Sequence, residues 1–225
     1  MNQKVWIVLA LEAVFFAGLL FGAAGTLRWP AAWAYLAIFF SAAVLITRTL
    51  ARDDPALLQE RMKPIIQKNQ PLWDKIVISV IALLWVGWMP LMGLDAVRFG
   101  WSVVPIGIQV IGAAGLAVGM WICHRAFRAN TFLAPVVKIQ SERNQQVVSS
   151  GPYGIVRHPM YAGALILIPS TALLLGSWYG LAASSLLVCG LIVRTDLEDR
   201  ELRHRLDGYE GYTQRVRYRL VPFVW

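Results

Sequence analysis

The chain has 225 residues, of which 57% are hydrophobic and only 15% carry a charge. Soluble domains carry about 25% charged residues, so this composition excludes an ordinary soluble domain and favours a protein embedded in a lipid bilayer. The net charge of +8 does not indicate nucleic acid as a partner, because the basic residues flank apolar runs, where they meet anionic lipid head groups. Cys123 and Cys189 lie in apolar runs without further ligands nearby, and they predict neither a disulfide nor a metal site.

Four long apolar runs follow one another along the first half of the chain. In chain order they cover residues 5–27, 31–47, 76–94 and 103–123. Each comes close to or exceeds the ~20 residues that cross about 30 Å of hydrocarbon as a helix, so we predict four transmembrane helices. The first run is longer than the roughly 7–15-residue apolar core of a signal peptide, and we expect it to remain as a span.

A fifth apolar stretch, residues 161–193, is interrupted at 176–180 by the sequence Gly-Ser-Trp-Tyr-Gly. This interruption predicts a tight hairpin of two short helices of about 15 residues each. A re-entrant pair that stops part-way through the bilayer is the alternative. With a spanning hairpin, the chain is an all-α, polytopic membrane protein with about six transmembrane helices.

Lys and Arg are distributed unevenly between the segments that join these spans. If the N-terminus is cytoplasmic, the cytoplasmic segments carry 19 of the 21 basic residues, and only Arg28 and Arg98 fall on the other side. These segments are 1–4, 48–75, 124–160 and 194–225, with 1, 6, 5 and 7 basic residues. Cytoplasmic loops of membrane proteins are rich in Lys and Arg, so we predict that both termini are cytoplasmic.

The polar residues that could do chemistry are concentrated in the second part of the chain. We therefore divide it into residues 1–123, which hold the first four transmembrane helices, and a catalytic region, 124–225. The catalytic region comprises a cytoplasmic loop, the hairpin and a cytoplasmic C-terminal helix. In the 48–75 loop, Asp53-Asp54-Pro55 predicts the start of a short surface helix.

The most informative segment is 151–163, which reads Gly-Pro-Tyr-Gly-Ile-Val-Arg-His-Pro-Met-Tyr-Ala-Gly. The proline after His158 favours extended backbone at His158, followed by a helix with Pro159 in its first turn. The free backbone N–H groups at such a helix start suit a carboxylate or another anionic group of a ligand. Arg157 and His158 add hydrogen-bond donors beside it. On the residues alone, an interfacial loop with anchoring aromatic side chains fits equally well.

A second polar group of residues follows the last apolar stretch. Arg194 and Glu198 are four residues apart, so they lie on one face of a helix just outside the hydrocarbon. Solvated ion pairs on a helix that leaves the membrane would explain most charged residues here. The hairpin returns Arg194 and Glu198 beside the His158 segment, however, where a carboxylate could accept hydrogen bonds and an arginine could orient an anionic substrate.

The two segments together resemble a known family. The features are Gly-Pro-Tyr, Arg-His-Pro-x-Tyr-x-Gly, a helical hairpin, Arg-x-x-x-Glu-acid-x-x-Leu, Tyr-x-x-Tyr and a late Pro. This combination, over roughly residues 120–222, is similar to the isoprenylcysteine carboxyl methyltransferases, and related phospholipid methyltransferases share it. The resemblance implies transfer of a methyl group from S-adenosylmethionine to a lipophilic, membrane-embedded acceptor.

The resemblance also implies roles for individual residues at a cytoplasmic site. Arg194 matches the position associated with the substrate, and Arg194 and Glu198 would be the catalytic pair. Residues that would bind the cofactor are Gln145, Gln146, Val147, Val148, Tyr153, His158, Pro159, Met160, Tyr161 and Glu198. Two positions depart from the pattern: Gln145 replaces a common His, and Asp199 replaces a common Glu. Lys138 lies near a cofactor-contacting Gln of the family, with Gln140 two residues away, so the resemblance leaves that contact open.

We expect the acceptor to enter laterally between helices, beside Arg194. The cofactor would enter from the cytoplasm and be covered by the 138–153 loop and the segment 209–222. The resemblance leaves the acceptor open between a prenylcysteine carboxylate, a phospholipid amine, a small thiol and an isoprenoid. Two other classes of protein share parts of the pattern: NADPH-dependent sterol reductases, which are usually longer, and a non-catalytic membrane scaffold of the same fold.

Overall fold

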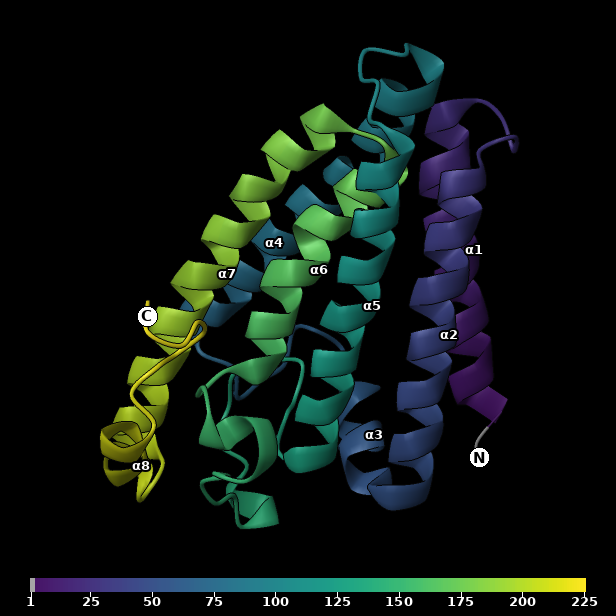
Figure 1. Cartoon of the computed structure of the whole chain (residues 1–225). Helices are drawn as coiled ribbons and strands as arrows, with labels where there is room; N and C mark the ends of the chain where they lie inside the picture. The colour runs from purple at the N-terminus through teal and green to yellow at the C-terminus, as the bar shows by residue number, and fades with distance from the viewer. Residues whose placement is uncertain (1–2) are drawn as a thin grey trace.

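The computed structural model describes residues 3–225, which form helices and loops with no strand among them (Figure 1). Six helices are long: α1 (Gln3–Ala24), α2 (Pro30–Asp53), α4 (Leu72–Gly93), α5 (Ile106–Ala129), α6 (Pro159–Leu175) and α7 (Trp178–Arg205). The short elements are α3 (Pro55–Arg61), α8 (Tyr209–Arg215), a π-helical turn (Leu94–Arg98) and two 3-10 turns (Ser141–Arg143, Gly151–Gly154). The predicted all-α class is confirmed.

Five of the long helices are long and apolar enough to cross a bilayer: α1, α2, α4 with its π-helical extension, α5 and α7. The sixth, α6, is apolar but has only 17 residues. At 1.5 Å per residue it extends about 25 Å, slightly less than the ~30 Å hydrocarbon core. The expected six helices are therefore present, and full spanning by the α6–α7 hairpin remains a prediction.

The helix starts follow the capping rules applied to the sequence. Helix α3 begins at Pro55, and the carboxylate of Asp54 accepts a hydrogen bond from the Leu57 N–H at 3.0 Å. Helix α6 begins at Pro159, as predicted, with His158 in a non-helical conformation before it. Proline at these positions costs no helical hydrogen bond, because the first N–H groups of a helix have no partner inside it.

The hairpin between α6 and α7 turns at two residues. Gly176 has a φ of +80°, a left-handed conformation that glycine adopts without steric cost. Ser177 caps α7 by accepting from the Gly180 N–H at 2.7 Å, and its hydroxyl donates to the buried carboxylate of Asp95. The break predicted at 176–180 is confirmed, and Asp95 attaches this turn to the end of α4.

Helices α5 and α6 lie in close contact because small residues face each other. A Cβ atom at Gly112 would lie 2.4 Å from the backbone nitrogen of Leu174, and one at Gly119 would lie 2.8 Å from the carbonyl oxygen of Gly163. Small residues permit such close approach between membrane helices. In Figure 1, α6 lies between α5 and α7, with α4 behind it.

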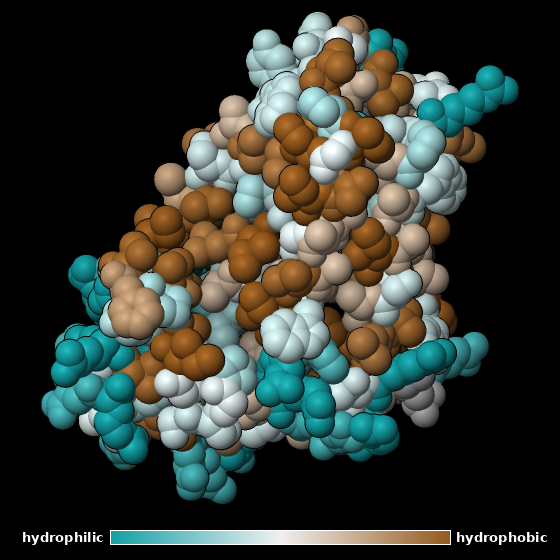
Figure 2. Space-filling view, in the orientation of Figure 1, coloured by the Kyte–Doolittle hydropathy of each residue, from teal (hydrophilic) through white to brown (hydrophobic). Residues whose placement is uncertain are grey.

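Polar structure gathers at one end of the bundle. Helices α3 and α8 and the loops of residues 130–158 lie at the lower end in Figure 1, where the N-terminal end of α1 also lies. Figure 2 shows hydrophilic side chains concentrated at this end and mostly apolar side chains above it. We call it the polar end. Its location on the cytoplasmic side remains a prediction.

Candidate functional site

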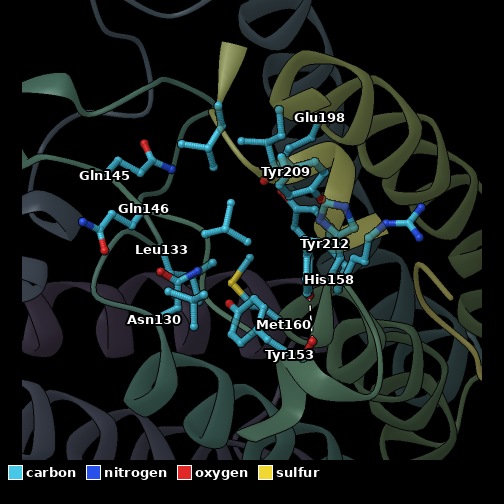
Figure 3. A pocket seen from close by; sticks show the side chains of 16 residues that line it. Asn130, Leu133, Gln145, Gln146, Tyr153, His158, Met160, Glu198, Tyr209 and Tyr212 are labelled. Atoms are coloured by element: carbon cyan, nitrogen blue, oxygen red, sulfur yellow. Dashed lines mark hydrogen bonds between the residues drawn. The ribbon is translucent and has the colours of Figure 1, made fainter. Parts of the chain in front are cut away.

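A pocket opens at the polar end, between the start of α6, the end of α7, α8 and the loop that precedes Tyr153. It encloses about 530 Å³, counting its opening to solvent. The residues that line it are Asn130, Leu133, Gln145, Gln146, Val147, Val148, Tyr153, Arg157, His158, Met160, Tyr161, Glu198, Leu202, Leu206, Tyr209 and Tyr212. Figure 3 shows Gln145 and Gln146 on one side of the space, and Glu198, His158 and the two C-terminal tyrosines on the other.

The structure brings together nine of the ten residues expected at a cofactor site. These are Gln145, Gln146, Val147, Val148, Tyr153, His158, Met160, Tyr161 and Glu198. The tenth, Pro159, lines a neighbouring apolar groove instead. Lys138 and Gln140 do not line the pocket: Lys138 pairs with Glu60, and the buried amide of Gln140 bonds Phe132 and Arg143.

Asp199 is the electrostatic centre of the polar end. Its side chain is fully buried, and it accepts two hydrogen bonds from Arg157, at 2.7 and 2.9 Å. His158 lies 3.2 Å from the same carboxylate, and the Tyr209 hydroxyl donates to it at 3.0 Å. A buried charge needs such compensation, so Asp199 sets the positions of Arg157, His158 and Tyr209, three residues of the pocket wall.

The C-terminal tail is bonded to the segment before α6. The backbone N–H groups of Arg157 and His158 donate to the carbonyl oxygens of Tyr218 and Arg219 at 2.9 and 3.0 Å. Arg219 also reaches Asp199, at 3.1 Å. The tail therefore holds the two residues before α6 in place, and the expectation that the C-terminal segment covers the site agrees with Tyr209 and Tyr212 in its wall.

Four buried tyrosines line the pocket, and three of them lie outside the long helices, at Tyr153, Tyr209 and Tyr212. Burial raises the pKa of Tyr153, Tyr209 and Tyr212 above that of an ordinary phenol, so all three remain protonated at neutral pH. The Tyr212 hydroxyl donates to the Tyr153 carbonyl oxygen at 2.7 Å. The buried Tyr153 hydroxyl makes no well-aligned hydrogen bond with the described residues, although the Asn130 side chain lies beside it.

Arg194 and Glu198 both lie next to Tyr161, at different parts of its side chain. The Tyr161 hydroxyl donates to the Glu198 carboxylate at 2.6 Å, on the pocket side. The guanidinium of Arg194 lies 5.8 Å from the centre of the Tyr161 ring and does not line the pocket. The two residues share a helix, as expected, but only Glu198 lines the pocket.

Arg194 is bound to Asp74, a residue outside the sequence motifs. Its Nε donates to the buried carboxylate of Asp74, in the first turn of α4, at 2.9 Å. The second Asp74 oxygen accepts from Gln70 and from the Val137 N–H, both at 2.8 Å. One Arg194 nitrogen donates to the Pro135 carbonyl at 3.0 Å, and Nη1 makes no hydrogen bond with the described residues. Asp74 therefore orients Arg194 and leaves one donor group unused.

These groups fit S-adenosylmethionine by their chemistry. The N–H groups of Met160 and Tyr161 at the start of α6 have no acceptor among the described residues, and such groups bind carboxylates. Glu198 offers a carboxylate for an ammonium or a ribose hydroxyl. Leu133, Leu202 and Leu206 provide apolar surface for a flat base. Within residues 3–225, no group of three or more His, Cys, Asp or Glu could hold a metal ion.

The comparison with known families agrees with the geometry. Residues 108–206 match the family model described as phospholipid methyltransferase. The matched region runs from α5 to the end of α7 and contains every lining residue of the pocket except Tyr209 and Tyr212. This match confirms the resemblance seen in the sequence for residues 108–206, which are similar to phospholipid methyltransferases. The match indicates a membrane methyltransferase.

Proposed function

We propose that this chain is an integral membrane methyltransferase that uses S-adenosylmethionine to methylate a lipophilic acceptor at the cytoplasmic face of the bilayer. The observation that carries the proposal is the single pocket that joins nine residues expected at a cofactor site. The positive charge of the polar-end loops supports the cytoplasmic side. An acceptor of the isoprenylcysteine carboxylate type and a phospholipid amine are both compatible with the matched family.

The protein's part in this reaction is alignment. S-adenosylmethionine supplies a methyl group on a sulfonium, and its transfer is an in-line displacement. The pocket residues hold the cofactor: backbone N–H groups at the start of α6 bind its carboxylate, and Glu198 binds its ammonium or ribose. Holding two reactants in a near-attack geometry can contribute about 7–11 kcal/mol to such a step. Arg194, oriented by Asp74, would orient the acceptor from its position over the Tyr161 ring.

Cofactor binding provides the first test. Purified protein in nanodiscs is titrated with radiolabelled S-adenosylmethionine and, separately, with NADPH. We expect S-adenosylmethionine to bind, and Glu198→Ala and His158→Ala each to weaken binding about 10-fold or more, since each removes a charged or polar contact worth about 1.5 kcal/mol or more. Arg200→Ala is the control, because Arg200 is exposed on α7 and its ion pair in the described part of the chain is with Asp196.

The alternatives give different results in the same titration. Tight binding of NADPH alone would identify a reductase of the sterol-reductase kind and exclude the proposal. Unchanged affinity in both Glu198→Ala and His158→Ala would show that the cofactor lies elsewhere. Cofactor binding without turnover on a prenylcysteine carboxylate, a phospholipid amine, a small thiol or an isoprenoid would indicate a non-catalytic scaffold.

A further inference from the structure

Residues 219–225, which follow α8 and are here called the C-terminal turn, fold into a closed turn. The carbonyl oxygen of Trp225 accepts hydrogen bonds from the backbone N–H groups of Arg219, Leu220 and Val221, at 2.9, 3.1 and 3.3 Å. The Arg219 guanidinium lies 4.8 Å from the centre of the Trp225 ring. The turn is therefore held in shape by bonds and contacts among its own residues.

The C-terminal turn lies against the apolar part of the helices. Leu220 and Trp225 pack in one cluster with Leu191, which belongs to the apolar stretch of α7 that precedes Arg194. Residues 220–222 also form one wall of an apolar groove on α5 and α6. In Figure 1 the chain end marked C lies beside α7, further from the polar end than α8. After α8 the chain thus returns from the polar end to the edge of the apolar zone.

Two apolar side chains of the C-terminal turn face outward. Phe223 is 89% exposed and Val224 is 78% exposed. Phe223 also has a φ of +66°, a left-handed conformation that is rare for bulky residues. Its ring contacts that of Tyr218, at 5.3 Å between centres, but most of its surface is left uncovered. A strained backbone that presents an exposed aromatic ring contributes little to the fold, which points to a contact outside the chain.

The charges that precede the C-terminal turn suit a lipid surface. Arg215 and Arg217 are exposed, and neither makes an ion pair within residues 3–225. Segments that lie in a membrane interface place apolar and aromatic side chains at the boundary of the acyl chains, and their basic residues meet anionic head groups. Because the turn packs on helices that are apolar enough to cross a bilayer, lipid is the partner that this chemistry fits.

We propose that the C-terminal turn re-enters the membrane interface at the polar end, where Phe223 and Val224 contact lipid, and that this contact positions the wall of the pocket. The connection is short, because Arg219 reaches Asp199 at 3.1 Å and its carbonyl oxygen accepts from the His158 N–H at 3.0 Å. The lipid contact itself requires only that the helices lie in a bilayer. Its effect on the cofactor rests on the proposed function.

Spin labels measure the lipid contact without any cofactor. Phe223→Cys and Val224→Cys are labelled in a Cys189→Ala background in nanodiscs, and collisions with oxygen, which concentrates in hydrocarbon, are compared with collisions with a water-soluble nickel chelate. Cys123 is buried and should not react, whereas exposed Cys189 in wild type provides the lipid reference. Gly211→Cys on α8 provides the water reference, because nothing lies within 4 Å of its added Cβ. We expect both labels on the turn to favour oxygen, as the lipid reference does.

Matched variants measure the effect on the pocket. Phe223→Gly keeps the turn, because glycine adopts a positive φ without steric cost, but it removes the lipid contact. We expect it to weaken S-adenosylmethionine binding in nanodiscs about 3- to 10-fold. Val224→Ser should weaken it less, and Phe223→Leu, which stays apolar, should retain it. Val103→Ser is the control, because Val103 is 85% exposed in the loop before α5, at the opposite end of the bundle.

Three results would overturn the inference. Labels at positions 223 and 224 that favour the nickel chelate, as the label on α8 does, would place the turn in water. Unchanged cofactor affinity in both Phe223→Gly and Val224→Ser would disconnect the lipid contact from the pocket. An equal loss of affinity in Phe223→Leu would show that the apolar character of the side chain is not what matters. Failure of the proposed function looks different, since wild type would then bind no S-adenosylmethionine while the labels still reported lipid.

Discussion

The two parts of the chain contribute to the candidate site in different ways. All residues that line the pocket come from positions 130–212, in the second part. Residues 3–123 line none of it, yet three of their charged side chains bind residues of the second part beside the pocket: Asp74 binds Arg194, Glu60 pairs with Lys138, and Arg61 donates to the Leu133 carbonyl. The second part thus forms the pocket, and the first part supports its wall from outside.

Residues of the second part would contact a ligand directly, whereas charged residues of the first part hold neighbouring residues of the second part in place. A change in the second part should alter the affinity for the cofactor directly. A change at Asp74, Glu60 or Arg61 should act through Arg194 or through the 133–140 segment, and should leave the affinity for the cofactor largely unaffected. Variants that disturb one part of the chain and leave the other intact therefore test this difference.

The largest effect is expected at Asp199, inside the second part. Asp199→Asn removes the counter-charge of the buried Arg157 and weakens the bonds to His158 and Tyr209. Breaking a buried ion pair from one side costs about 3–5 kcal/mol. We expect a strong drop in the thermal unfolding temperature in detergent, and loss of S-adenosylmethionine binding even at temperatures where the variant remains folded.

Asp196→Asn is the matched control for Asp199→Asn. Asp196 lies three residues earlier on α7, is partly exposed and pairs with Arg200 and Arg219. Surface pairs contribute about 0–1 kcal/mol, so this variant should unfold close to wild type. Equal effects of the two substitutions would contradict the central role of Asp199.

The second-largest effect is expected at Asp74, which connects the first part of the chain to Arg194 in the second part. Asp74→Asn leaves the Arg194 guanidinium with a neutral partner and weakens the bond to the Val137 N–H. Hydrogen bonds to charged groups contribute about 1.5–3 kcal/mol. We expect unfolding stability to fall by that amount and kcat to fall about 10-fold, with the Kd for S-adenosylmethionine within about 2-fold of wild type. A large loss of cofactor affinity would instead assign Asp74 to the cofactor site.

Much of the fold could be predicted from the sequence because its signals are local. Apolar runs of span length predicted the long helices, and Pro55 and Pro159 predicted two helix starts that the structure has. The break after Leu175 was also visible as a cluster of turn residues. Each of these signals depends on a few neighbouring residues and on the bilayer as solvent, so no knowledge of tertiary packing was needed.

The pairings across the two parts could not be predicted in this way. Asp74 and Arg194 are 120 residues apart, and nothing near Asp74 distinguishes it from an ordinary acidic residue in the first turn of a helix. That Glu198 lines the pocket and Arg194 does not was missed for the same reason, because helical spacing gives a shared face but not what packs on it. Pro159 was placed correctly at the helix start, but it faces the other groove.

The third-largest effect is expected where helices α5 and α6 pack closely, because the first residues of α6 line the pocket. Gly112→Ala places a methyl group 2.4 Å from the Leu174 backbone nitrogen, so α5 and α6 must separate. Overpacking of this kind costs about 1–3 kcal/mol. Gly18→Ala on α1 is the control, because nothing lies within 4 Å of its added Cβ. The thermal unfolding temperature should fall in Gly112→Ala and not in Gly18→Ala. A drop of similar size in Gly18→Ala would contradict the close packing of α5 on α6.

The smallest effect is expected at Lys138, whose buried ion pair with Glu60 joins the two parts. Burial would raise the pKa of Glu60, but hydrogen bonds from Lys138 and Lys63 outweigh this and hold the pKa below the ordinary value. Glu60 therefore stabilises the fold above its unfolded-state pKa, near 4.5, and this contribution is lost as pH falls through the lower folded-state pKa. Lys138→Gln should cost less at pH 7 than the about 3–5 kcal/mol typical of a broken buried ion pair, because Lys63 still bonds Glu60. The difference from wild type should shrink on acidification and vanish once Glu60 is protonated. Urea unfolding at pH 7, 5 and 3 measures it, and a difference that stays constant across these pH values would show that Lys138 acts without Glu60.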